Sequence, residues 1–322
     1  MSDFLTSIEK AAAKLDERRQ SRLRDTSVDF EAYMKARDED IGKVKDAKSF
    51  REDLHEEFFG EEEMRGLHLP WREAGHDFRI RPGEVTLWAG YNGHMKSMVT
   101  GYVMMHLLHQ GQKACIASFE MKPRKTLRRM ATQAVGTRSP SAKYIDKFLD
   151  MLTGKLWLYD QQGEVSVERL MGVIYYCAEQ LGVTQFVIDS MMKVVADEDD
   201  YNGQKRFMGK LCAAAKDLNI HIHLVLHARK GVDENKRPGK QDIKGSGSIV
   251  DQTDNCVVVF KTPKKPTDDD SKPDFVLYFD KQRHGEWEGY APLWFDEASL
   301  QFKESPRDRS QCWVDEAEEE YV

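Results

Sequence analysis

The segment GYNGHMKS at residues 90–97 constrains the fold more than any other part of the chain. It follows the apolar, strand-like run EVTLWAG and precedes residues whose apolar side chains recur at helical spacing. At such a turn, backbone N–H groups at the helix start converge on an anion, a Lys adds charge and a Ser can bind Mg²⁺. The sequence therefore predicts a phosphate-binding loop. Its residues are Gly90, Tyr91, Asn92, Gly93, His94, Met95, Lys96 and Ser97.

The spacing matches the phosphate-loop pattern GxxxxGK[ST] except at one position, where Met95 stands in place of Gly. Gly at that position accepts backbone angles and a close phosphate approach that a side chain resists. A degenerate match by itself is more often an ordinary strand-to-helix turn that contains glycines. The neighbouring motifs have to decide between the two interpretations.

Strand-like runs alternate with helical segments after the first 65 residues or so, which is the rhythm of a parallel sheet covered by helices. We expect strands at 85–89, 114–119, 156–159, 186–189, 221–226 and 256–260, and helices at 97–108, 125–135, 167–181 and 204–218. The run FVLYFDKQRHGEWEGYAPLWFD predicts a β-hairpin with a Gly-containing turn. The expected fold class is α/β with a mainly parallel central sheet.

The charge pattern divides the chain into three parts. Residues 1–65 predict a charged helical arm and linker, residues 66–303 the α/β domain, and residues 304–322 an acidic tail. Two interpretations of the arm are open, a solvated leader or a helix that docks on a neighbouring subunit.

The composition excludes several classes of protein. Of 322 residues, 40% are hydrophobic and 32% charged, and no apolar run approaches the ~20 residues of a membrane span. The N-terminus has no signal core, so we expect a cytoplasmic protein. The five cysteines form no CxxC pair, which fits a reducing compartment better than a zinc site. The net charge of −7 means that any nucleic-acid surface must be local.

Two acidic residues end predicted strands beside the phosphate loop. Asp189 closes the run FVID, where it could hold the shell of a Mg²⁺ ion, although a helix cap is the commoner role for such an Asp. Glu120 ends ACIASFE, where it could act as a base on an attacking water. Ligands of open α/β sheets bind at the carboxyl ends of the strands. The joint occurrence therefore favours a nucleotide site.

His227 ends the run HIHLVLHA and would face the same crevice, where it could hydrogen-bond a γ-phosphate. His221 and His223 alternate with it on the same strand. A single histidine is more often a satisfied side chain without a ligand. Only the position of His227 at the strand's end favours a functional role.

A basic, Gly-rich stretch without apolar anchors, ARKGVDENKRPGKQDIKGSGS, follows His227 directly. It carries six positive and three negative residues. A mobile basic loop tethered to a nucleotide-sensing strand suits movement along a phosphate backbone. A solvated surface loop is about as good an explanation of the charge alone. The candidate DNA-binding residues are Arg229, Lys230, Lys236, Arg237, Lys240 and Lys244.

Lys281 and Arg283 lie in the predicted hairpin. An Arg on a rigid hairpin can reach a neighbouring subunit's nucleotide and stabilise the charge of the transition state. Ordinary cross-strand surface charges are the commoner explanation.

Taken together, these segments resemble the hexameric replicative helicases of the DnaB, Twinkle and phage helicase-primase group. The resemblance covers about residues 70–295 and rests on RPGEVTLWAGYNGHMKS, ASFEM, FVID, LHARKG, KGSGSIVDQTDNCVVVF and the segment 281–285 with Gly289 and Tyr290. The GSG-containing block is the most specific of these. The resemblance implies a RecA-like fold and an ATP-dependent ring, of six subunits, that moves 5′ to 3′ on single-stranded DNA and unwinds duplex at a fork.

The resemblance also implies roles by position. Lys96 and Ser97 would bind the phosphates and Mg²⁺ of ATP or another nucleoside triphosphate. Asp189 would belong to the metal shell, Glu120 would be the catalytic base, and His227 would sense the γ-phosphate.

Further roles concern the interface and the DNA. Arg283 would be a finger acting in trans, assisted by Lys281, and Arg138 would pack on the nucleotide base. The basic loop would face the ring's central channel.

Two features modify this picture. Met95 favours an alternative, a RecA-like protein that binds nucleotide and DNA with weak or absent ATPase and serves as a scaffold, loader or recombination accessory. No primase-like module fits in the charged first 65 residues, so primase is expected as a separate chain.

The acidic tail is similar to those by which phage helicases contact their DNA polymerase, although solvated acidic tails are common.

Overall fold

The computed structural model describes residues 45–60, 66–72, 77–194, 200–229, 235–239, 242–243, 247–264, 271–285 and 287–314. The chain divides into two compact units, Met1–Glu61 and Glu62–Val322. In the first unit, the 3-10 helix η1 (Ala47–Phe50) leads into α3 (Arg51–Phe59). The side chain of Asp46 accepts a hydrogen bond from the backbone N–H of Lys48 at 2.9 Å and so caps η1. The described part of the expected arm is therefore helical.

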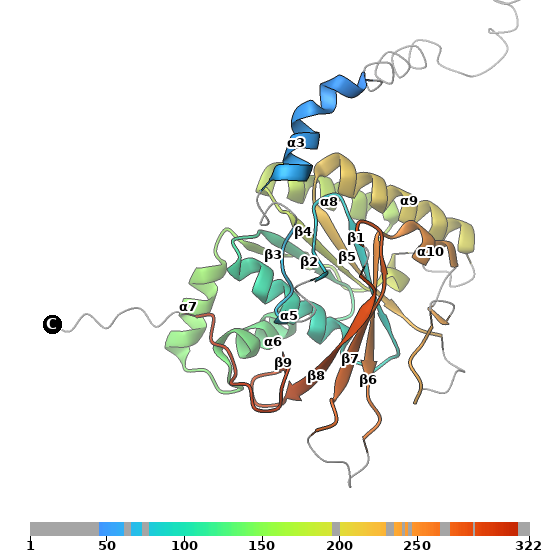
Figure 1. Ribbon diagram of the computed structural model, residues 1–322. Coiled ribbons are helices and arrows are strands. Elements are labelled where there is room, and N and C mark those ends of the chain that lie inside the picture. The colour runs from blue at the N-terminus through green and yellow to red at the C-terminus, as the bar shows by residue number, and fades with distance from the viewer. Residues whose placement is uncertain are drawn as a thin grey trace, which may run out of the picture. The chain divides into compact units, whose positions relative to one another are not determined.

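The second unit is built on one nine-stranded sheet with the order β3-β2-β4-β5-β1-β6-β7-β8-β9 (Figure 1). The strands are β1 (Val85–Gly90), β2 (Ala114–Ser118), β3 (Leu156–Leu158), β4 (Gln185–Asp189), β5 (His221–His227), β6 (Asn255–Lys261), β7 (Phe275–Gln282), β8 (Gly289–Asp296) and β9 (Gln301–Lys303). Neighbouring strands from β3 to β6 are parallel, and β7, β8 and β9 extend the sheet antiparallel. The predicted parallel sheet and C-terminal hairpin are confirmed.

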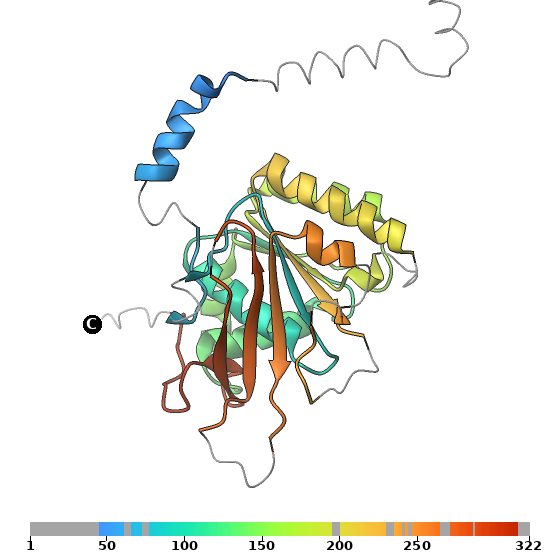
Figure 2. The same ribbon diagram turned by 45° about the vertical axis from the view of Figure 1, so that its right-hand side comes forward.

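Helices cover both faces of the sheet, which makes three layers. They are α5 (Lys96–His109), α6 (Pro123–Val135), α7 (Ala142–Leu152), α8 (Val167–Leu181), α9 (Tyr201–Leu218) and α10 (Gly247–Gln252), with the short 3-10 helix η3 (Met191–Lys193). Residues of α5, α6 and α7 share one hydrophobic cluster with the sheet, and residues of α8, α9 and α10 share the other. In both views α10 lies alongside α9 (Figure 2).

Strand β1 lies in the middle of the sheet and is buried along its whole length. Val85, Leu87 and Ala89 pack into the cluster of α8, α9 and α10, whereas Trp88 packs into the other cluster. Burial on both faces explains why this strand is almost entirely apolar in sequence. Because β5 and β6 both pair with β1 in parallel, their carboxyl ends all reach the same edge of the sheet.

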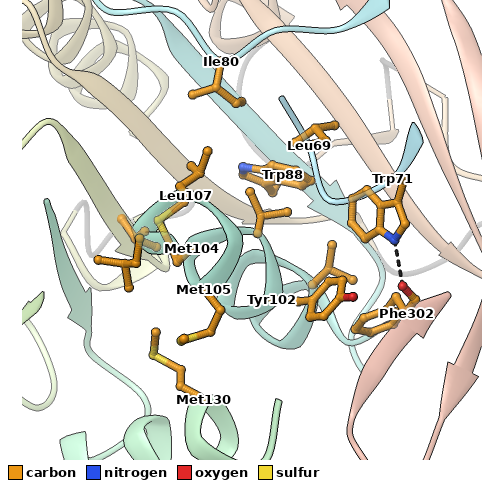
Figure 3. Packing of buried hydrophobic residues seen from close by; sticks show 14 of the residues in the cluster. Leu69, Trp71, Ile80, Trp88, Tyr102, Met104, Met105, Leu107, Met130 and Phe302 are labelled. Atoms are coloured by element: carbon orange, nitrogen blue, oxygen red, sulfur yellow. Dashed lines mark hydrogen bonds between the residues drawn. The ribbon is translucent and has the colours of Figure 1, made fainter. Parts of the chain in front are cut away.

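Helix α5 packs deep in the core, with its large apolar side chains buried against β1 and against chain segments distant in sequence (Figure 3). The indole of Trp71 donates a hydrogen bond to the carbonyl oxygen of Phe302 at 2.8 Å, and both rings pack close to Tyr102 of α5. The segment before β1 and the strand β9 therefore close the same side of the core.

Several elements were not expected from the sequence. Helix α7 begins after Ser141, whose hydroxyl accepts a hydrogen bond from the backbone N–H of Tyr144 at 3.4 Å. Helix α10, the 3-10 helix η3 and the edge strand β9 were also missed. Among the helices that the structure describes, none is long and apolar enough to cross a membrane.

Candidate functional site

The expected phosphate loop connects the end of β1 to the start of α5. Gly90 lies so close to β6 that a Cβ atom there would collide with the carbonyl oxygen of Val259. Gly93 has a φ of +81°, in the left-handed region. Both glycines are therefore required by the backbone, one by close approach and the other by conformation.

Met95 occupies the position immediately before α5, with φ 56° and ψ 27°. This is the left-handed conformation, which costs a residue with a Cβ atom roughly 1–2 kcal/mol. The Met95 side chain is half-buried and packs against the hydrophobic cluster of α5. The backbone thus keeps the shape for which the pattern has Gly, although a methionine stands there.

The side chain of Lys96 turns back into the loop. Its Nζ donates hydrogen bonds to the carbonyl oxygens of Gly90 at 3.0 Å and Tyr91 at 2.8 Å. The residue is buried, with 5% exposed, and this burial lowers the pKa of the amine to about 8 against the opposing charges of Asp189 and Glu120. A buried cation at the start of a helix makes this end of the sheet suited to an anion, and the two acids beside it are of the kind that bind a metal ion.

Asp189 ends β4 and is buried, with its side chain hydrogen-bonded to that of Ser97 in the first turn of α5. Burial raises the pKa of this carboxyl most strongly, and Glu120 raises it further, whereas Ser97 lowers it. The expected pair of oxygen ligands for Mg²⁺, a hydroxyl and a carboxylate, is therefore in direct contact.

Glu120 follows β2, and its Oε1 accepts a hydrogen bond from the hydroxyl of Ser190 at 3.2 Å. Nε2 of His227, at the end of β5, lies 3.9 Å from the same oxygen. The interaction with His227 is the largest cause that holds the pKa of Glu120 below its usual value, against partial burial. Glu120 is therefore ionised at neutral pH, as a general base must be.

The second ring nitrogen of His227 is also relevant to the site. This atom, Nδ1, is buried without a hydrogen-bond partner among the residues that the structure describes. An unpaired buried ring nitrogen is unfavourable unless a ligand or water satisfies it. The histidine is thus able to bind a further polar group at the sheet edge.

Five of the predicted side chains lie at one end of the parallel strands. Lys96 and Ser97 lie in the first turn of α5, Glu120 follows β2, and Asp189 and His227 end β4 and β5. The structure therefore brings together the residues predicted to bind phosphate, hold a metal, act as base and sense the γ-phosphate.

His221 and His223 are satisfied core histidines. Nε2 of His221 lies 2.9 Å from the hydroxyl of Thr86, and its Nδ1 lies 2.6 Å from the carbonyl oxygen of Arg81. Burial lowers the pKa of His221 to about 4 and that of His223 well below its usual value. Both belong to the fold and not to the site.

The described part of the basic segment is tied back onto the domain. The guanidinium of Arg237 lies 3.1 Å from Oδ1 of the buried Asp280 and 4.4 Å from the ring centroid of Tyr278, both on β7. The backbone N–H of Arg229 donates to the carbonyl oxygen of Asp242 at 2.7 Å. Lys236 is exposed. Three further candidates lie outside the described residues: Lys230, Lys240 and Lys244.

Lys281 and Arg283 converge on the C-terminus of α10. Nζ of Lys281 donates to the carbonyl oxygens of Val250, Asp251 and Thr253 at 2.7–2.8 Å. A guanidinium nitrogen of Arg283 donates to those of residues 251–253 at 3.0–3.2 Å. Cations stabilise a helix at this end because its last carbonyls lack partners and carry partial negative charge.

Asp254 links Arg283 to the start of β1. Its Oδ1 lies 3.4 Å from Nε of Arg283, and its Oδ2 accepts a hydrogen bond from the backbone N–H of Val85 at 2.9 Å. The phosphate loop follows the other end of β1, five residues further along the strand, which corresponds to about 17 Å at the rise of a strand. Arg283 therefore lies at the opposite edge of the sheet from Lys96 of the same subunit.

Arg138, predicted to pack on the nucleotide base, is an exposed residue of the turn between α6 and α7. Its predicted packing on the nucleotide base stays a prediction.

Four partners of the predicted residues were missed in the sequence: Ser190, Asp254, Tyr278 and Asp280. Ser190 and Asp254 directly follow or fall within quoted motifs, FVID and KGSGSIVDQTDNCVVVF, so their positions carried a signal. Tyr278 and Asp280 alternate on one strand, and nothing in the sequence indicates that Arg237 reaches them.

Comparisons with known proteins bear on the family and the fold of the chain. The family of the DnaB-like helicase C terminal domain matches residues 80–304. A "DNA helicase/primase" of Enterobacteria phage T3 is 26% identical over 124 residues, which are 35% of this chain and 22% of that protein. The chain thus matches only about a fifth of this relative's length.

Two solved structures share the fold. One, described as an "ATPase Domain", has a TM-score of 0.70 at 15% identity and covers 81% of this chain and 99% of its own. The other, "The Structure Of A DnaB-Like Replicative Helicase And Its Interactions With Primase", has a TM-score of 0.70 at 13% identity, with 92% and 75% covered. The fold is RecA-like, and the chain belongs to the family of the DnaB-like helicase C-terminal domain.

Proposed function

We propose that the protein is an ATP-dependent DNA helicase whose nucleotide site is the cluster around the phosphate loop. The observation that carries this proposal is the convergence of Lys96, Asp189, Glu120 and His227 at the carboxyl edge of the sheet. One buried cation, one buried acid, one ionised exposed acid and one histidine are the groups that nucleotide hydrolysis requires. Family membership supports the same class of activity.

The residues present fit a magnesium nucleotide. The hydroxyl of Ser97 and the carboxylate of Asp189 are hard oxygen donors, already in contact at the start of α5. Among the described residues, no group of three or more His, Cys, Asp and Glu side chains could hold a metal. Mg²⁺ does not need one, because it is usually held by one or two protein oxygens together with substrate phosphates. Bound there, it would neutralise charge on the phosphates.

Glu120 and His227 would act on the attacking water and on the terminal phosphate. Glu120 would orient and deprotonate the attacking water, because its carboxylate is ionised and half exposed at the edge. His227 would hydrogen-bond the terminal phosphate with a ring nitrogen and report its presence to the basic segment that follows β5. Lys96 would exchange its two carbonyl partners for phosphate oxygens.

Arg283 would complete the site of a neighbouring subunit, assisted by Lys281. Its position at the opposite edge of the sheet supports action in trans, since a side chain cannot span the length of β1. A finger in trans requires a closed ring, for which six subunits is the expectation. Release of the α10 carbonyls would accompany its engagement.

The basic segment would contact single-stranded DNA, with Arg229, Lys236 and Arg237 among the described candidates. Movement from 5′ to 3′, action at a replication fork, a separate primase and a polymerase contact through the acidic tail belong to the same proposal. The tail's acidic residues 315–320 lie outside the described residues. The relatives described as helicase/primase and as a helicase interacting with primase support the replicative context.

A second candidate function follows from Met95. The left-handed conformation of a bulky residue at the phosphate loop favours a protein that binds nucleotide and DNA but hydrolyses slowly, as a scaffold or loader. Phosphate release with and without single-stranded DNA separates the two functions. The helicase proposal expects DNA to stimulate release and a labelled fork to be unwound. Background release together with intact nucleotide binding would leave the scaffold function.

A further inference from the structure

His94 anchors the phosphate loop to the end of strand β6. Its Nδ1 accepts a hydrogen bond from the backbone N–H of Lys261, at the end of β6, at 3.1 Å. Its ring makes edge contacts with Phe260 at a centroid distance of 5.6 Å and with Tyr91 at 5.2 Å. The residue is buried, with 9% exposed, although its loop neighbours Asn92 and Gly93 are exposed.

This anchor sits directly beside the one unfavourable backbone conformation of the loop. Met95, the next residue, is held left-handed and caps α5 without any hydrogen bond from its own side chain. A loop with Met at this position tends to relax toward the right-handed region, which would move the N–H groups at the start of α5. Fixing the preceding residue to β6 opposes that movement.

We propose that His94 is a positioning residue that latches the phosphate loop to strand β6 and so keeps Met95 in the conformation that phosphate binding requires. This inference rests on the proposed function, because it assumes that the loop binds phosphate. The latch is the hydrogen bond from Lys261 N–H to the unprotonated Nδ1, and the ring that carries this acceptor is seated against Phe260. It makes a methionine tolerable where the pattern has Gly.

Two substitutions separate the hydrogen bond from the ring. His94→Leu keeps an apolar side chain but removes the acceptor, whereas His94→Asn retains an acceptor oxygen near the place of Nδ1. Two readouts are measured on the full chain: exchange of the Lys261 amide hydrogen, and the Kd of a fluorescent ATP analogue with Mg²⁺. We expect His94→Leu to speed the exchange and to weaken binding about tenfold, the loss that follows from one buried hydrogen bond. His94→Asn should recover most of both.

Met95→Gly provides the test of mechanism. With Gly at this position the left-handed conformation is unstrained, so adding His94→Leu to Met95→Gly should weaken nucleotide binding less than His94→Leu does beside Met95. The matched control is His109→Leu, an exposed histidine in the last turn of α5, which should bind as the unaltered protein does. Melting temperatures of all variants exclude unfolding as the cause.

The outcomes are distinct. Equal binding by His94→Leu and the unaltered chain, or equal losses with and without Met95→Gly, overturns the latch. Equal losses for Leu and Asn at position 94 also overturn it, because they leave only ring packing. If the unaltered chain binds no nucleotide, the proposed function fails, and the amide exchange of Lys261 still decides whether His94 holds the loop to β6.

Discussion

Nε2 of His227 lies 3.9 Å from Oε1 of Glu120, although the two residues end strands that are separated in the sheet by β4. The distance is too long for a hydrogen bond but short enough for the imidazole to stabilise the carboxylate. Ser190, which follows the intervening strand β4, donates a hydrogen bond from its hydroxyl to the same carboxylate oxygen. The carboxylate of Glu120 is therefore held from two neighbouring strands.

Glu120→Gln should abolish turnover without abolishing binding. The amide keeps the size of the side chain but cannot accept a proton from water, so we expect phosphate release to fall by about 10²- to 10⁴-fold. The Kd of the nucleotide should change by less than about threefold, because Glu120 is not among the phosphate ligands. Both are measured with and without single-stranded DNA. Glu168→Gln, an exposed acid on α8 that pairs with Lys210, serves as control. Normal turnover by Glu120→Gln would remove Glu120 as the base.

Arg283→Ala should leave nucleotide binding nearly intact and reduce DNA-stimulated turnover by roughly 10³-fold or more, the usual effect of losing an arginine finger. Asp254→Asn should give a smaller loss of the same kind, since the amide can still accept from Val85 N–H but no longer attracts Arg283 by charge. Nucleotide Kd and steady-state turnover are the measurements. An equal loss of binding in Arg283→Ala would mean that Arg283 serves its own subunit.

His106 predicts part of the pH dependence of stability. Burial, with smaller effects of His109 and His68, lowers the pKa of His106 to about 4. The unfolded chain then binds more protons than the folded chain between about pH 6.5 and pH 4, so stability falls as the pH drops through that window. From these pKa values, protonation of His106 in the unfolded chain removes about 2 kcal/mol of unfolding free energy at pH 5 relative to neutral pH.

Urea unfolding at pH 7.5 and at pH 5 measures this effect. His106→Leu should shrink the difference between the two pH values by about that amount, 2 kcal/mol. Other buried groups with shifted pKa values also change the stability difference between the two pH values. Glu84, whose pKa burial raises, is one of them. Their effects are the same with and without His106→Leu, so they cancel in the comparison. An unchanged difference in His106→Leu would show that His106 titrates normally in the folded state.

Met95→Gly should change function more than stability. Relief of the left-handed strain, about 1–2 kcal/mol, is offset by the greater entropy of Gly in the unfolded chain and by lost packing. We expect the free energy of unfolding to stay within about 1 kcal/mol while turnover rises. Urea unfolding and phosphate release are measured on the same preparations. A fall in turnover would show that the methionine side chain itself contributes to the site.

Much of the fold could be predicted because burial on both faces makes the central strands apolar throughout and the phosphate loop fixes the order of the first strand and helix. Strands β1, β2, β4, β5 and β6 lie where their apolar runs predicted them. Helix α7 was missed despite a capping Ser141 and apolar residues at helical spacing, signals that were present. The short edge strand β9 has too few residues for a pattern.

The candidate site was predictable where it depends on the phosphate-loop pattern or on strand ends. Asp189 and His227 could be placed because parallel strands bring their carboxyl ends to one edge. The partners of Lys281 and Arg283 could not be predicted, because they are backbone carbonyl oxygens of α10, which every residue type has. The engagement of Arg237 by Tyr278 and Asp280 depends in the same way on tertiary contact.

Strand β1 has the phosphate loop at one end and the Asp254-bound arginine at the other. The strand is buried and paired on both sides, so the roughly 17 Å between its two ends are fixed, and no change of rotamer can bring the loop and the arginine of one molecule together. With the role in trans proposed for Arg283, one chain supplies the phosphate loop of one nucleotide site and the arginine of the next. Turnover would then depend on the number of subunit interfaces, and activity per unit of protein should rise with protein concentration.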